Sequence, residues 1–335
     1  ALHRAKANID VWVREADAPS GAVRVSVAEL KSFLSNPFLH HARRVLGWRD
    51  EESPETLDAT HEPVGVSKLD DAKWKSELLP WIAQEVWNDG DVESRVREFA
   101  GSKAWETAFP EALLARLESE SLLEWARWVG RKMSELRQGH PRHRLVRGVD
   151  LSLGDPSRPA ALERIVEGRR TLVVGRIPLA LVPESDADPV VLMHCAKVEV
   201  KAKIPSVPIS KSFGMHLLAM AVSATGRPNP VAIATFGREA SQEMAREDAR
   251  EAPEGWMDRV LLDMLSHGSE YLPAKAILEQ KEGKLDLGAL REALEKDEFA
   301  DPLERMFEPS LPGEEDEDVD LLMKIVERRL GPFLG

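Results

Sequence analysis

The hydrophobic and polar positions of the chain change their repeat near Pro141. Before this residue, apolar side chains recur every three or four positions over residues 26–47 and 67–138, which is the spacing of one face of an α-helix. After it, apolar and polar residues alternate, which is the two-residue repeat of a half-buried strand. The pattern predicts a mainly helical first part, followed by a part that contains a sheet.

The first helix is bounded by recognisable end signals. Ser26 is a suitable N-cap, and Glu29 three residues later completes a capping box. Asn36-Pro37 is expected to break the helix and restart it, because proline fits the first helical turn but not the interior. In the second helical region, the residues Asn88-Asp89-Gly90 and Pro110 predict further interruptions.

Tryptophan is concentrated in the second helical region. Six of the nine tryptophans lie there: Trp74, Trp81, Trp87, Trp105, Trp125 and Trp128. Exposed aromatic rings can stack on nucleic-acid bases. The intervals between these residues are helical, however, and so favour a packing seam between helices over a base-stacking surface.

The remainder of the chain predicts an α/β core. Strands are expected over 143–155, 169–183, 189–203 and 229–237, and helices over 210–226, 239–250, 255–267, 273–296 and 318–330. An acidic turn, Glu184–Asp188, separates the second and third strands. We therefore divide the chain into a linker or cut edge of a longer chain (1–25), a helical subdomain (26–139) and an α/β core with C-terminal helices (140–335).

Composition limits the classes of protein. The net charge of −13 argues against a protein held to DNA or to an acidic membrane by its overall field. Cys195 is the only cysteine, so the chain forms no internal disulfide and no cysteine zinc cluster. No apolar stretch reaches the roughly 20 residues that span a bilayer, and no signal-peptide pattern opens the chain. These features predict a soluble cytoplasmic protein.

The predicted strands at 143–155 and 189–203 carry the only set of residues in the sequence that suggests a specific catalytic chemistry. Glu199 and Lys201 have the acid-x-lysine form, which places both side chains on one face of a strand, and Asp150 could supply a second acid. Metal-dependent phosphodiester cleavage needs such carboxylates around Mg²⁺, with a lysine that stabilises the developing charge. The alternative is a solvated strand edge, because charged strands produce this triplet by chance.

Several segments, in this order, resemble one known family. They are VSVAELKSFLSNPFLHHARRVLGW with the later HEPV, then GRIP and its hairpin, SFGMHLLAMAVSATG, GSEYLPAKAILE, FADPLERMF and IVERRLGPFL. This ordered set resembles the C-terminal domain of RecC, the gamma subunit of exodeoxyribonuclease V, from about residue 24 to the end. The resemblance implies a restriction-endonuclease-like fold of the PD-(D/E)xK type with a degenerate site, inside a helicase–nuclease that processes double-strand DNA breaks.

The resemblance also implies that the nuclease site is inactive. Relatives that cut DNA carry Gly-Arg-Ile-Asp on the second strand and Asp-x-Lys on the third, whereas this chain has Pro178 and His194 at the acidic positions. Glu199 lies five residues after His194, roughly 16 Å along an extended strand, and is too distant to replace the missing acid. Proline also removes a ladder hydrogen bond, so Pro178 predicts an edge strand or a bulge.

The family further implies partners and a role. RecC is non-catalytic, guides DNA strands and docks the helicase subunits RecB and RecD, which bind ATP and Mg²⁺, so no cofactor or metal is expected in this region. Basic side chains on the first and third strands are candidates for phosphate contacts: Arg142, Arg144, Arg147, Lys197, Lys201 and Lys203.

Three alternatives to this reading remain open. The basic side chains could be ordinary solubilising surface charge. The region could be an assembly domain that never touches DNA. It could also be an active metal-dependent nuclease that uses Asp150, Glu199 and Lys201.

Overall fold

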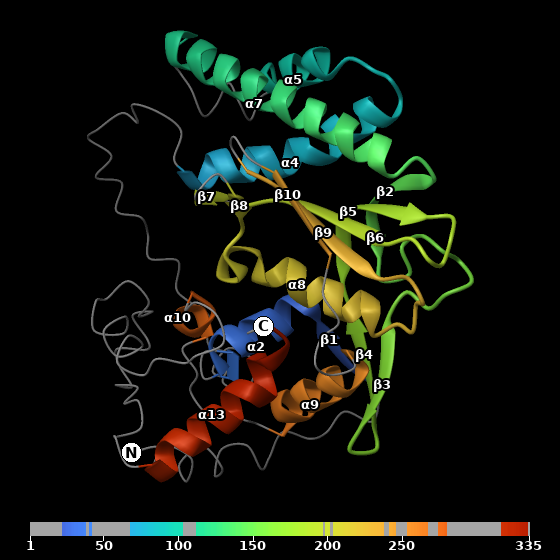
Figure 1. The fold of residues 1–335 in the computed structure, drawn as a ribbon, viewed down its shortest axis with the longest axis vertical. Coiled ribbons are helices and arrows are strands. Elements are labelled where there is room, and N and C mark those ends of the chain that lie inside the picture. The colour runs from blue at the N-terminus through green and yellow to red at the C-terminus, as the bar shows by residue number, and fades with distance from the viewer. Residues whose placement is uncertain are drawn as a thin grey trace.

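The computed structural model describes residues 22–37, 40–41, 68–102, 112–196, 198–201, 204–237, 241–245, 253–266, 274–279 and 316–333, and the account below concerns these residues. Helices and strands form layers around a central five-stranded sheet, with the helices of residues 68–139 above it in the view of Figure 1 and the first described helix, residues 27–35, below it. The predicted α/β class is confirmed.

Helix α2 (Val27–Ser35) begins and ends as the sequence predicts. The Ser26 hydroxyl accepts the Glu29 backbone N–H at 3.1 Å, and the Ser26 backbone N–H donates to Glu29 Oε2 at 2.7 Å. This reciprocal pair is the predicted capping box. The helix ends at Asn36, directly before Pro37, because proline disfavours helical backbone in the preceding residue.

The second helical region forms three helices, α4 (Lys68–Trp87), α5 (Val92–Ala100) and α7 (Ala112–Gly139). The predicted break at Asn88-Asp89-Gly90 is confirmed, since Asp89 has a φ of 54° and Asp91 caps α5 by accepting two backbone N–H groups. Pro110 and Trp105 lie outside the described residues. None of the described helices is long and apolar enough to cross a membrane.

The central sheet is mixed and has the strand order β10-β9-β6-β5-β2. Its strands are β2 (His143–Asp150), β5 (Arg176–Pro183), β6 (Val190–Cys195), β9 (Val231–Phe236) and β10 (Ser241–Ala245). Strands β6 and β9 are parallel, and the other neighbours are antiparallel. Helix α4 covers one face of this sheet, and α8 (Ile209–Ser223) covers the other (Figure 1).

Two smaller sheets correct the predicted strands. Strands β1 (Val23–Ser26), β4 (Arg169–Val174) and β3 (Leu162–Val166) form a sheet in the order β1-β4-β3, and β7 (Glu199–Lys201) pairs with β8 (Ile204–Ser206). The strands predicted over 169–183 and 189–203 are therefore each divided between two sheets. Strand β3 was not predicted.

The first of these divisions falls at Gly175, where the chain passes from β4 to β5. A Cβ atom here would lie 3.0 Å from Val27 Cγ2 and 3.1 Å from both Leu151 Cδ2 and Leu218 Cδ1. Glycine is required because α2, the loop after β2 and α8 all approach the backbone at this point. The glycine of the Gly-Arg-Ile-Pro segment thus marks a crossing between sheets.

The predicted helix over 239–250 is wrong where it can be compared. Residues 241–245 form strand β10, which pairs antiparallel with β9 from Ser241–Phe236 to Ala245–Ala232. This segment carries good helix formers, but the free edge of β9 offers a complete row of hydrogen-bonding groups. Tertiary pairing overrides the weak local propensity.

Two hydrophobic clusters lie on opposite faces of the central sheet. One joins α4, α5 and α7 to the sheet, and includes Trp125 and Leu181. The other joins α2 and α8 to α9 (Pro253–Leu265), α10 (Ala274–Glu279), α13 (Asp316–Leu330) and the short turn Gly331–Phe333. Helix α2 therefore packs with α8, on the opposite side of the sheet from the helices that follow it in sequence.

Candidate nucleic-acid interface

The ladder of strand β5 is interrupted at Pro178. The β2–β5 register runs from His143–Pro183 to Asp150–Arg176, and the only pair missing from it is Gly148 opposite Pro178. On its other side, β5 pairs with β6 only through Ala180–Leu192 and Leu181–Val191. Because β5 is an interior strand, the predicted edge position is wrong, and the unchanged register also excludes an inserted bulge residue against β2.

At this interruption, the alternating side chains of both β2 and β5 switch to the other face of the sheet. Val146 and Val149 contact the same α8-side cluster although they are three residues apart, and so do Ile177 and Ala180. Strand geometry would send side chains three residues apart to opposite faces. Gly148 makes the turn possible with a φ of 58°. The backbone is therefore redirected at the position where the family resemblance would place an acidic metal ligand.

His194 lies on β6 and contacts the neighbouring strand. Its Nε2 atom is 2.9 Å from Thr235 Oγ1 on β9. The pKa of His194 is lowered to about 4, mainly by burial and also by the positive charge of His216 on α8, against a smaller raising effect of a backbone hydrogen bond at Cys195. His194 is consequently neutral at physiological pH, and its side chain is tied to a threonine hydroxyl.

The low pKa of His194 makes the folded state sensitive to acid. The unfolded chain binds a proton at this residue below about pH 6.5, whereas the folded chain binds it only near pH 4. The contribution of His194 to stability is therefore fully present above pH 6.5 and is lost as the pH falls towards 4, by about 1.4 kcal/mol per pH unit. We expect His194→Gln to reduce this slope in urea unfolding curves measured from pH 7 to 4. An unchanged slope would contradict the assignment.

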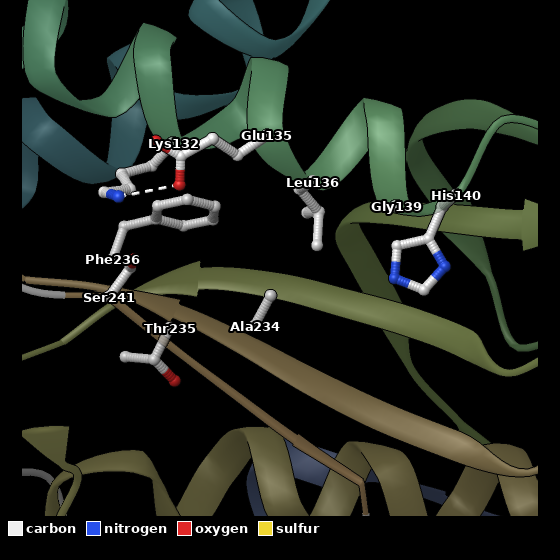
Figure 2. Close-up of a pocket in the computed structure, with 9 residues that line it drawn as sticks. All are labelled: Lys132, Glu135, Leu136, Gly139, His140, Ala234, Thr235, Phe236 and Ser241. Atoms are coloured by element: carbon white, nitrogen blue, oxygen red, sulfur yellow. Dashed lines mark hydrogen bonds and ion pairs between the residues drawn. The ribbon is translucent and has the colours of Figure 1, made fainter. Parts of the chain in front are cut away.

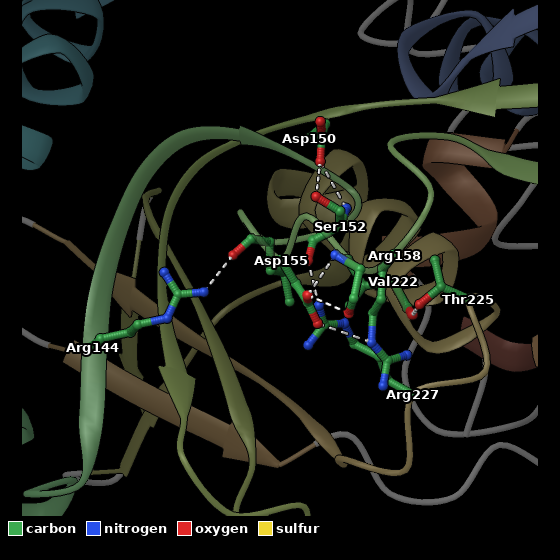
Figure 3. Close-up of polar contacts among 10 residues, drawn as sticks. Arg144, Asp150, Ser152, Asp155, Arg158, Val222, Thr225 and Arg227 are labelled. Atoms are coloured by element: carbon green, nitrogen blue, oxygen red, sulfur yellow. Dashed lines mark hydrogen bonds and ion pairs between the residues drawn. The ribbon is translucent and has the colours of Figure 1, made fainter.

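The Asp150 carboxylate accepts hydrogen bonds from a residue of the turn that follows it. Its Oδ1 atom accepts the Ser152 backbone N–H at 2.9 Å and also accepts the Ser152 hydroxyl (Figure 3). Glu199 and Lys201 lie on β7, in the two-stranded sheet, and Figure 1 shows β7 and β2 on opposite sides of the view. The structure does not bring these three residues together, because the predicted third strand ends at Cys195 before β7 begins.

The described residues contain no group of three His, Cys, Asp or Glu side chains that could hold a metal ion. The side chains of Glu199 and Lys201, and all of Lys197 and Lys203, lie outside the description. The basic set on the third strand therefore stays a prediction.

The three arginines of β2 and its preceding turn do not form one line. Arg144 lies on the α8 side of the sheet, where its Nη2 atom donates to the Leu153 carbonyl at 3.1 Å. Arg147 lies on the other face, with its guanidinium carbon 4.8 Å from the centre of the Trp81 ring. Arg142 is exposed in the turn before the strand. The alternation of the strand separates Arg144 from Arg147.

Arg144 is instead grouped with two arginines that the sequence analysis did not select. Arg158 Nε lies 3.3 Å from Asp155 Oδ2, and Arg227 donates to the Ser152 carbonyl (Figure 3). Burial lowers the pKa of Arg227, and the charges of Arg158 and Arg144 lower it further, against the opposing effects of Asp155 and Asp186. These residues are distant in the chain, so no local pattern could have revealed the group.

A separate pocket of about 230 Å³ lies between α7 and strands β9 and β10 (Figure 2). The Lys132 Nζ and Glu135 Oε2 atoms form an ion pair of 2.7 Å along its helical wall, and His140 lines one end. On the same face of the sheet, burial raises the pKa of the Cys195 thiol to about 12, so this cysteine is a poor nucleophile.

The sequence profile of the RecC C-terminal domain family matches residues 22–204, slightly more than half of the 335-residue chain. The chain belongs to the RecC C-terminal domain family. Membership places this RecC domain in a subunit of a RecBCD-type complex, and it confirms the family predicted from the ordered segments. No curated protein matches the chain. The matched RecC region contains Asp150, Pro178, His194 and Glu199, whereas α8, β9 and Arg227 follow it.

Proposed function

We propose that the chain is a non-catalytic DNA-processing domain of the RecC subunit of an exodeoxyribonuclease V-type helicase–nuclease. In this role it guides DNA strands and docks the helicase subunits RecB and RecD during double-strand break repair. The observation that carries the proposal is the family match over residues 22–204. The proposal includes a degenerate restriction-endonuclease-like core with no cofactor of its own, since ATP and Mg²⁺ would be bound by the partner subunits.

The strand geometry supports the non-catalytic part of the proposal. A metal-dependent nuclease needs carboxylates that converge on the ion. At the two positions that the family resemblance aligns with those carboxylates, the chain has Pro178, where the ladder to β2 is interrupted, and His194, which is neutral and bonded to Thr235. Asp150 is engaged by Ser152, and Glu199 lies in another sheet.

The test combines DNA binding with DNA cleavage. The purified chain is titrated against a labelled single strand and a forked duplex at increasing salt, and linear duplex DNA is incubated with the chain and Mg²⁺ or Mn²⁺. We expect binding that weakens with salt, because phosphate contacts release counterions, and we expect the DNA to remain intact. A Lys201→Glu/Lys203→Glu variant should bind less tightly if the third strand contributes.

Two other outcomes would replace the proposal. Absence of DNA binding at low salt, together with co-purification with RecB and RecD, would favour an assembly domain, and the net charge of −13 makes this the second candidate. Metal-dependent degradation of DNA that Glu199→Ala abolishes would establish an active nuclease instead.

A further inference from the structure

We propose that Arg158 and Arg227, together with Arg144 across the loop after β2, bind backbone phosphates of DNA. This inference rests on the proposed function and locates one part of the DNA path. It assigns that path to the α8 side of the central sheet, at the end of β2. The set predicted from the sequence shares only Arg144 with this site.

The site is built on a rigid loop, residues 151–158. Leu151 and Leu153 are both fully buried and anchor the loop in the core. Leu153 and Gly154 both have left-handed backbone, with φ of 59° and 73°, which turns the loop sharply back. Arg227 and Arg144 then hold its carbonyls from two sides, at Ser152 and Leu153 (Figure 3).

The strand and the helix that precede or carry the arginines are also fixed in place by the rest of the fold. Arg144 lies on β2 in the continuous part of the ladder, opposite Val182 of β5. Arg227 follows the buried helix α8, directly after Gly226, whose φ of 72° ends the helical backbone. A charged group that is fixed in this way loses little conformational entropy when a ligand binds.

Positive charge exceeds negative charge among Arg227 and the groups whose charges act on it. Arg144, Arg158 and Arg227 face two carboxylates, Asp155 and Asp186. The Asp155 carboxylate is itself shared, since Ser157 donates to it through its backbone N–H at 3.0 Å and its hydroxyl at 2.6 Å. These two hydrogen bonds are the largest cause of the lowered pKa of Asp155, followed by the charges of Arg227 and Arg158. Asp155 thus neutralises the arginines only in part.

Arg227 also retains hydrogen-bonding capacity that the described residues do not use. Its Nε atom is buried and has no acceptor among them. A buried charged donor without a partner is costly, and an oxygen of a bound anion would satisfy it. The planar guanidinium group matches the geometry of a phosphate, which makes arginine well suited to hold this ligand.

Nucleic-acid phosphate fits the site better than a base. The side chains that form the contacts of the cluster are arginines, aspartates and serines, and none of these offers an aromatic ring for a base to stack on. Arg158 remains accessible, with 31% of its side chain exposed, and Arg144 is exposed. The site would therefore hold the backbone without reading sequence, as expected for a domain that guides DNA of any sequence.

The test uses the full chain and an Arg144→Gln/Arg158→Gln variant. Affinity for a fluorescein-labelled dT20 strand and for a forked duplex is measured by anisotropy at several salt concentrations. We expect the dissociation constant to rise roughly 3- to 10-fold at low salt, and the slope of log K against log salt to fall by about 0.7 for each lost contact with a single strand. Thermal unfolding confirms that the variant is folded.

The matched control is Arg116→Gln. Arg116 is 79% exposed on α7, on the opposite side of the central sheet, and its change removes one positive charge from a surface ion pair with Glu120. We expect this variant to bind DNA as the wild type does. A second arm adds inorganic phosphate to the wild type and to the double variant and measures the midpoint of thermal unfolding.

Each outcome decides between distinct statements. If the wild type binds DNA and the double variant binds equally well, the phosphate site is disproved while the proposed function stands. If phosphate raises the midpoint of the wild type but DNA affinity is unchanged in the variant, the site binds free anions and the DNA assignment is wrong. If the wild type itself does not bind DNA, the proposed function fails first.

Discussion

Replacing Asp263 by alanine is expected to lower the free energy of unfolding by about 3–5 kcal/mol, because it removes the carboxylate that faces a buried arginine. Arg329 is fully buried, and its Nε donates to Asp263 Oδ2 at 2.9 Å. Arg328 donates to the same oxygen at 2.8 Å. Removing one acceptor from a buried guanidinium group leaves a desolvated donor behind, and this costs more than the hydrogen bond itself contributes.

The position of Arg329 enlarges this effect. Its guanidinium carbon lies 5.0 Å from the centre of the Phe33 ring on α2, and its backbone carbonyl accepts the Trp256 Nε1–H of α9 at 3.2 Å. Helix α13 thereby joins the N-terminal helix to α9, although the three segments are widely separated in sequence. Loss of the Asp263 carboxylate should therefore weaken the packing of all three segments.

Asp258, which lies on α9 as Asp263 does, provides the control for this prediction. Its carboxylate is 40% exposed and accepts the Arg164 Nε at 2.6 Å, so it is also an arginine partner, but at the surface. We expect Asp258→Ala to cost about 1 kcal/mol or less, since exposed ion pairs contribute little. Urea unfolding followed by circular dichroism measures both. Equal effects of the two substitutions would show that burial does not determine the strength of the Asp263 contact.

The helix ends of this chain could be predicted because their signals are local. The capping residues Ser26 and Glu29 contact each other across three positions, and the break at Asn88-Asp89-Gly90 depends on backbone conformations that those residues favour. The helix that ends before Gly226 follows the same rule. These predictions needed no knowledge of the rest of the fold.

The sheets could not be predicted in the same way, because their partners are distant. Gly175 divides a continuous apolar run between two sheets, and only the approach of α2 and α8 explains this. Residues 241–245 become a strand because β9 has a free edge. Local alternation gives no indication of either, since it reports burial on a face and not the identity of the neighbour.

The candidate site also combines features that could be predicted from local sequence with features that depend on distant segments. Pro178 and His194 were selected from the family resemblance, and the predicted effect of Pro178 is correct only in part: the ladder is interrupted there, but β5 is an interior strand and not an edge. Arg158 and Arg227 were missed because nothing in sequence connects them. They meet only when the loop after β2 folds against the end of α8.

A second large loss of stability is expected from the replacement of a buried tryptophan. Trp125 is 4% exposed, lies in the cluster between α7 and the sheet, and donates from Nε1 to the Gly237 carbonyl at 3.0 Å. We expect Trp125→Ala to lower the free energy of unfolding by about 3–5 kcal/mol, since it leaves a cavity and removes a hydrogen bond. This follows from the packing role predicted for the helical tryptophans.

Trp81 is the informative comparison, because it departs from that prediction. It is 41% exposed, and the guanidinium carbons of Arg95 and Arg147 lie 3.9 Å and 4.8 Å from the centre of its ring. Exposed cation–π contacts contribute roughly 0.5–1 kcal/mol each, so Trp81→Ala should cost about 1–2 kcal/mol. Urea unfolding followed by far-ultraviolet circular dichroism separates the two variants without relying on tryptophan fluorescence. If Trp125→Ala instead left stability unchanged and weakened DNA binding, the base-stacking interpretation would replace the packing one for this residue.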